Sequence, residues 1–160
     1  MKKIVLSILV VFGIVLLTGC GASKLDLSKT SHIICRKTET KSSDITTTVL
    51  ALAYDKNGKI TDFKVDTDVQ YIKQMSPEAI EIVEKTMKLI GKIPGISFES
   101  KVGDSSLYYS FSGNIKMFKT IMKQVNKDYD ESKVTGDTKS EALKELTKDG
   151  YTCEDYVKED

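Results

Sequence analysis

The chain has 160 residues, with 24 lysines and arginines against 23 aspartates and glutamates, and a formal net charge of +1 at neutral pH. This length suits one domain with a sizeable core. The balanced charge argues against nucleic acid as a partner and against strong electrostatic attraction to lipid head groups.

The first twenty residues have the pattern of an export signal. Lys2 and Lys3 precede an apolar run over residues 4–17, and residues 17–20 read Leu-Thr-Gly-Cys. Fourteen helical residues span about 21 Å, which is short of the roughly 30 Å hydrocarbon core of a bilayer. A lipoprotein signal is therefore favoured over a retained transmembrane anchor or a plain secretory signal.

The Leu-Thr-Gly-Cys sequence resembles the lipobox of bacterial lipoproteins. The resemblance implies a signal peptide over residues 1–19, cleavage before Cys20, and a diacylglyceryl group on that cysteine. Two acyl chains meet the two-signal requirement for stable anchoring. We therefore expect a protein that is lipid-anchored to the cell membrane on its extracytoplasmic face, with residues 20–31 as lipidated cysteine and flexible tether.

Residues 32–157 are expected to form a single α+β domain, which begins with three strands. The first covers residues 32–40, and the second covers residues 45–54 and is apolar on both faces at its end. Asn57-Gly58 indicates a hairpin turn. The alternative for this turn is a calcium loop, but Ala53 and Lys64 would then occupy ligand positions that require acidic side chains, so the turn is favoured.

The third strand has the clearest pattern in the chain. Polar and apolar side chains alternate with period two, which predicts a half-buried strand with one solvated face. The apolar side has Phe63, Val65, Thr67, Val69 and Tyr71, and the polar side has Asp62, Lys64, Asp66, Asp68 and Gln70.

A helix is predicted from Ser76-Pro77 to Gly91, with Ser76 as its N-cap and an inward stripe of Ile80, Val83, Met87 and Ile90. A second hairpin follows over residues 96–112. In its second strand Tyr108 points to the face opposite the apolar residues, so we expect it to be an exposed aromatic on a candidate interaction surface.

Two more helices and a strand complete the predicted domain. The first helix covers residues 114–127, and its inward residues are Met117, Phe118, Ile121 and Val125. After a polar surface loop, Thr138 and Glu141 form a capping box that begins the last helix. A short strand over residues 151–153 closes an antiparallel sheet of about five strands, in the element order β-β-β-α-β-β-α-α-β, with the helices packed on one face.

Several segments resemble the YehR-like family of small bacterial lipoproteins, a domain family of unknown function. The likeness covers roughly residues 32–153, and its motifs are the strand containing Cys35, the alternating strand over residues 63–71, residues 94–98 (Pro-Gly-Ile-Ser-Phe), and the segment from Ser140 to Tyr151. The resemblance implies a mixed fold with helices on one face of a sheet, and it implies no activity.

Cys35 and Cys153 remain after Cys20 is assigned to the lipid. Outside the cytosol such a pair forms a disulfide bridge, and two buried free thiols are the alternative. The bridge would close a loop of about 118 residues, for which chain entropy gives nearly 5 kcal/mol of stabilisation.

Catalytic and metal-binding motifs are missing from the sequence. The single histidine, His32, stands at the edge of the tether, and there is no nucleophile elbow, His-Glu-x-x-His or Walker motif. We therefore expect no enzyme activity, no cofactor and no metal site.

Three classes of function remain. The favoured one is a non-catalytic module that binds an envelope protein or component through a sheet edge or an aromatic patch such as Tyr108. The alternative is a carrier of a small molecule or lipid, which needs a cavity between sheet and helices. The least favoured is an enzyme with paired carboxylates, such as Glu99 with an acid of the Asp62–Asp68 strand.

Overall fold

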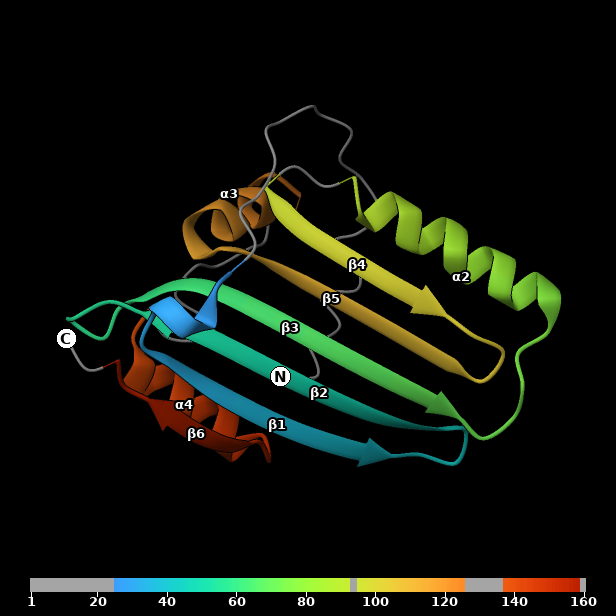
Figure 1. Ribbon diagram of the computed structural model, residues 1–160, viewed down its shortest axis with the longest axis horizontal. Coiled ribbons are helices and arrows are strands. Elements are labelled where there is room, and N and C mark those ends of the chain that lie inside the picture. The colour runs from blue at the N-terminus through green and yellow to red at the C-terminus, as the bar shows by residue number, and fades with distance from the viewer. Residues whose placement is uncertain (1–24, 93–94, 126–136, 159–160) are drawn as a thin grey trace.

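The computed structural model describes residues 25–92, 95–125 and 137–158 (Figure 1). The expected signal peptide over residues 1–19 and the expected lipidation site Cys20 lie outside the described residues. Most of the predicted surface loop between the last two helices also lies outside them.

Six antiparallel strands form one sheet in the order β4-β5-β3-β2-β1-β6, so the expected α+β class is confirmed. The described elements are the 3-10 helix η2 (Leu27–Lys29), β1 (His32–Thr40), β2 (Asp44–Tyr54), β3 (Ile60–Tyr71), α2 (Pro77–Ile90), β4 (Ile96–Val102), β5 (Ser106–Asn114), α3 (Ile115–Val125), α4 (Lys139–Lys148) and β6 (Thr152–Tyr156). The sheet has six strands where about five were expected, and their order along the chain is the expected one. The closing strand covers residues 152–156 where residues 151–153 were expected, and it pairs with β1 along all of its 5 residues.

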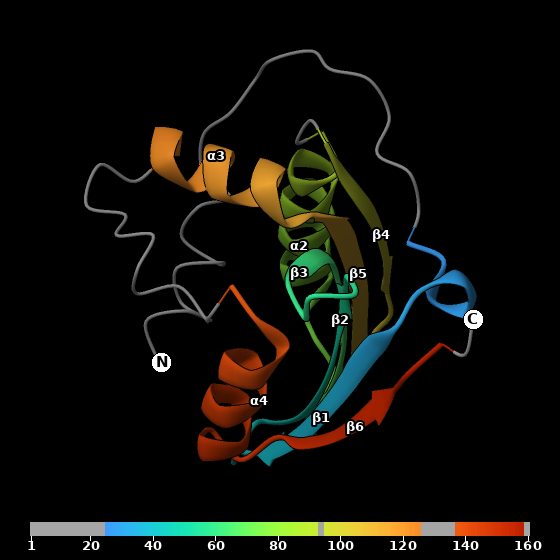
Figure 2. The ribbon, with the colours of Figure 1, turned by 90° about the vertical axis from the view of Figure 1, so that its left-hand side faces the viewer.

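One face of the sheet has no described α-helix packed on it. Figure 2 shows α3 and α4 on the same side of the sheet, while α2 runs along the β4 edge (Figure 1). The C-terminal end of α2 meets the helix-covered face, where Gly91 approaches the Phe98 ring. The short η2 lies on the opposite side from α3 and α4, beside the start of β1.

The core lies between the sheet and the helices. The Phe63 ring packs edge-on against Phe111 and Phe118, with ring centroids 5.9 and 5.3 Å away. From α4, Ala142 and Leu146 are buried in the same cluster. Such close packing of apolar side chains supplies most of the stabilisation of a domain of this size.

Two predicted helical stripes are less buried than expected. On α2 only Ile90 of the stripe is buried, because the helix flanks an edge strand and does not cross the sheet. On α3 the expectation that Met117 faces the core is wrong: the residue is 46% exposed, and its side chain lies across Gly95 at the border of the domain. The side chains of Ile121 and Val125 are outside the described part of α3.

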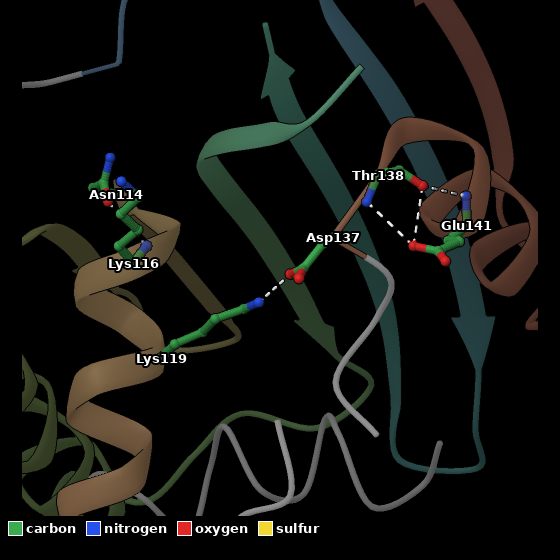
Figure 3. A network of polar contacts seen from close by, with 6 residues as sticks. All are labelled: Asn114, Lys116, Lys119, Asp137, Thr138 and Glu141. Carbon is green, nitrogen blue, oxygen red and sulfur yellow. Dashed lines mark hydrogen bonds and ion pairs between the residues drawn. The ribbon is translucent and has the colours of Figure 1, made fainter. Parts of the chain in front are cut away.

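The predicted helix caps are confirmed. The Ser76 hydroxyl accepts a hydrogen bond from the Ala79 amide at 3.3 Å, and Thr138 and Glu141 form the capping box. Figure 3 shows Lys119 reaching from α3 to Asp137, the residue before Thr138. This ion pair connects α3 to the start of α4, and the hydrogen bond from Lys119 holds the pKa of Asp137 below its ordinary value.

Residues 25–31, which we expected to belong to the tether, are held against the domain. Asp26 caps η2, and the Ser31 carbonyl accepts a hydrogen bond from the Tyr54 amide at 3.0 Å. The domain therefore starts several residues before His32, and fewer residues separate it from Cys20.

Cys35 and Cys153 form a disulfide, as expected. The two residues face each other across the β1–β6 pair, and Cys35 is fully buried. The bridge ties the first strand to the last across 118 residues of sequence.

We expect reduction of this bridge to lower the free energy of unfolding by about 3–5 kcal/mol, because the unfolded chain regains the entropy of an open loop. Urea denaturation of the mature protein, followed by circular dichroism with and without a thiol reductant, measures the change. In the double variant Cys35→Ala, Cys153→Ala the reductant should have no effect. Equal urea midpoints for the oxidised and reduced wild-type protein would contradict the expectation.

Candidate functional site on the open face of the sheet

The candidate site lies on the sheet face opposite α3 and α4, which we call the open face. Strand pairing places a polar set of side chains at its centre, on β3, β5 and β4. These side chains are Asp62, Lys64, Asp66, Asp68 and Gln70 of β3, Tyr108, Ser110, Ser112 and Asn114 of β5, and Ser97, Glu99 and Lys101 of β4.

Tyr108 links the three strands. Its hydroxyl lies 3.2 Å from Asp66 Oδ1 and 3.4 Å from Glu99 Oε1, so the two carboxylates flank one phenol. The hydroxyl carries one proton and donates it to one carboxylate at a time. Tyr108 is on the predicted face, but it is half-buried where we expected an exposed aromatic, because it leans over neighbouring side chains of the sheet.

Ser110 lies beneath this contact, between the two carboxylates. It pairs with Asp66 of β3 on one side and with Glu99 of β4 on the other, and it is only 4% exposed. Its hydroxyl acts to lower the pKa of both Asp66 and Tyr108. The cluster of Lys64, Asp66, Glu99, Tyr108 and Ser110 is therefore a connected polar network, which we call the Tyr108 network.

Asp66 is a stable anion in this network. Partial burial acts to raise its pKa, but hydrogen bonds from Lys64 and Ser110 and the Lys64 charge outweigh it, so the pKa lies below the ordinary value of 3.8. Lys64 Nζ is 2.7 Å from Asp66 Oδ2. The pKa of Tyr108 is raised, first by burial and then by the neighbouring Asp66 charge.

The lowered pKa of Asp66 and the raised pKa of Tyr108 suit these groups to hydrogen bonding with a partner more than to proton transfer. A catalytic acid needs a pKa raised towards neutrality, and the pKa of Asp66 is shifted the other way. An ionised carboxylate beside a phenol can accept hydrogen bonds from the amide, hydroxyl or ammonium groups of a partner. The geometry thus supplies hydrogen-bond acceptors on partly exposed side chains.

The other predicted residues lie apart from this network. His32 is at the start of β1, where its Nδ1–H donates to the Thr30 carbonyl at 2.8 Å and its ring stacks on Tyr156.

Among the described residues no three histidine, cysteine, aspartate or glutamate side chains gather as a metal site. Within the same residues no helix is both long and apolar enough to cross a membrane.

A second polar group was not anticipated from the sequence. Asp155 of β6 accepts a hydrogen bond from the Tyr54 hydroxyl at 2.7 Å and pairs with Lys139 Nζ at 2.8 Å, while Lys139 also lies over the Tyr54 ring. Burial and the bond to Asp155 raise the pKa of Tyr54. This group joins α4 to the β1–β6 side of the sheet and is structural.

Comparison of the chain with protein-family models, with curated proteins and with solved structures gave no match.

We expect Asp66→Asn to lower the free energy of unfolding at neutral pH by about 1–2 kcal/mol, because it weakens charged hydrogen bonds in the Tyr108 network. The pKa of Asp66 is lower in the folded state, so the unfolded state binds more protons. The ionised Asp66 carboxylate therefore stabilises the folded state fully above pH values near 3.8. This stabilisation is lost as the pH falls through the pKa that Asp66 has in the folded state. The variant should therefore show a flatter pH dependence below that value.

Urea denaturation between acidic and neutral pH measures both effects. Asp68→Asn is the matched control, since Asp68 is an exposed acid of the same strand and face and solvent screens its charge. Equal losses in the two variants would show that the network does not set the ionisation of Asp66.

Proposed function

We propose that the protein is a lipid-anchored, extracytoplasmic lipoprotein of the cell membrane that acts as a non-catalytic binding module for an envelope protein. The Leu-Thr-Gly-Cys sequence at residues 17–20, after a short apolar run, is the observation that carries the anchor. The site for binding is the open face with the Tyr108 network.

The disulfide supports the extracytoplasmic location. Disulfides persist in oxidising compartments and are rare where thiols are kept reduced. The Cys35–Cys153 bridge uses the two cysteines that remain once Cys20 carries the lipid.

The layout of the domain supports binding through the open face. The described α-helices cover the other face or flank the β4 edge, so a partner could reach the polar centre without rearrangement of the fold. The lowered pKa of Asp66 favours hydrogen bonding over acid catalysis. The alternative of a small-molecule carrier has less support, because the rings of Phe63, Phe111 and Phe118 occupy the space between sheet and α3.

For the anchor, we expect Cys20→Ala to leave the precursor uncleaved and without acyl chains, since both processing steps act at this cysteine. Mass spectrometry of the membrane fraction should find the wild-type protein starting at acylated Cys20. A wild-type protein that retains its first methionine and has no acyl mass would refute the proposed anchor.

For the binding surface, we expect a photoreactive amino acid at Asp68, on the open face, to give a cross-linked product in intact cells. The same amino acid at Lys144, an exposed position of α4, is the control and should give little product. Immunoblots of irradiated cells compare the two. A stronger product at Lys144 would place the binding surface on the helices and contradict the proposal.

A further inference from the structure

The first and last described residues of the domain lie at one end of the sheet. The Lys158 amide donates to Ser31 Oγ at 3.0 Å, and the rings of His32 and Tyr156 stack with centroids 5.1 Å apart. Figure 2 shows the chain after β6 running towards η2, and in Figure 1 the end of β6 and η2 lie at the same end of the sheet. We call this end of the sheet the anchor end.

Chain length holds the anchor end close to Cys20. Leu25, the first described residue, is half-buried and lies just before η2. Five Cα–Cα steps separate it from Cys20, and these reach at most about 18 Å in any conformation. By comparison, β1 alone extends about 26 Å from its first residue to its last at the usual rise of a strand.

Two exposed apolar side chains lie at the anchor end. Tyr156 is 44% exposed and Val157 is 67% exposed, and we call the pair the terminal patch. Tyrosine suits the bilayer interface, because its ring prefers an apolar environment and its hydroxyl prefers a wet one. Aliphatic side chains beside it can enter the boundary between head groups and acyl chains.

We propose that the terminal patch rests on the bilayer interface, so that the domain stands on its anchor end. This inference depends on the proposed acylation of Cys20. Because the anchor already holds the domain at the membrane, contact between the terminal patch and the bilayer is effectively intramolecular. A patch of two side chains is then enough to orient the domain, although it would bind a bilayer too weakly in a protein without an anchor.

Desolvation disfavours the alternative in which the open face lies flat on the membrane. Asp62, Lys64, Asp66 and Asp68 of β3 share that face with Lys101 of β4, and charged side chains are costly to remove from water. Standing on the terminal patch keeps these carboxylates in water. It also leaves the Tyr108 network accessible from the side.

The chain has no tryptophan, so a single introduced tryptophan reports its own surroundings. The experiment uses the full-length lipoprotein, extracted in detergent and reconstituted into phosphatidylcholine vesicles with and without brominated acyl chains. Val157→Trp probes the terminal patch. Ile72→Trp is the matched control, because Ile72 is 61% exposed and follows β3 at the far end of the sheet.

We expect brominated lipid to reduce the emission of Val157→Trp by about twofold or more, since interfacial side chains lie within reach of the upper acyl chains. The emission of Ile72→Trp should change little. Circular dichroism verifies that both variants fold, and the intact mass of each reports its acylation independently of fluorescence.

An acylated protein with no quenching at position 157, or with equal quenching at positions 157 and 72, would overturn the standing orientation and leave the anchor intact. A protein without acyl mass would overturn the proposed anchor, and with it this inference.

Discussion

The alternation of side chains along β3 is the constraint on which the arrangement of this domain depends. β3 pairs with β2 on one side and β5 on the other, so its two faces become the two faces of the sheet. A shift of one residue in its pairing would bury the aspartates and expose Phe63. Because charged carboxylates are costly to bury without partners, the register is strongly specified, and the hydrophobic face determines where the helices pack.

The β1–β6 pair has a different role, since it closes the domain. Strand β6 has 5 residues and lies at the sheet edge, where backbone pairing on one side alone gives limited stability. The disulfide to Cys35 and the contacts of Asp155 with Tyr54 and Lys139 compensate for this. As a result the last described residues are fixed beside the first described ones, and the anchor end gains a defined surface.

Much of the fold could be predicted from local signals in the sequence. The period-two pattern of β3, the Ser76 cap and the Thr138–Glu141 capping box each depend on neighbours within a few residues, and all are present. The sequence suggested Glu99 together with an acid of β3 only for the enzyme alternative, and it gave no sign of the contact between Tyr108 and Asp66. That contact requires the β3–β5 pairing, and its two residues are 42 apart in sequence. Likewise, the ordering of residues 25–31 depends on tertiary hydrogen bonds to Tyr54 and Lys158.

If Cys20 carries the lipid that we propose, the short chain between Cys20 and Leu25 limits where the open face can meet a partner. A long tether would let the domain rotate freely and meet partners at many heights above the bilayer. It would also lower the effective concentration of the domain near any one partner. With the proposed lipid on Cys20, a reach of at most about 18 Å would confine the domain to a layer next to the bilayer, and a partner would have to present its surface at that height. Donor groups of a membrane-embedded or membrane-anchored neighbour meet this condition, and they complement the carboxylates of Asp66 and Glu99. Under the proposed anchor, the carboxylates of the open face and the short connection would thus favour a lateral partner in the same membrane over a freely diffusing ligand.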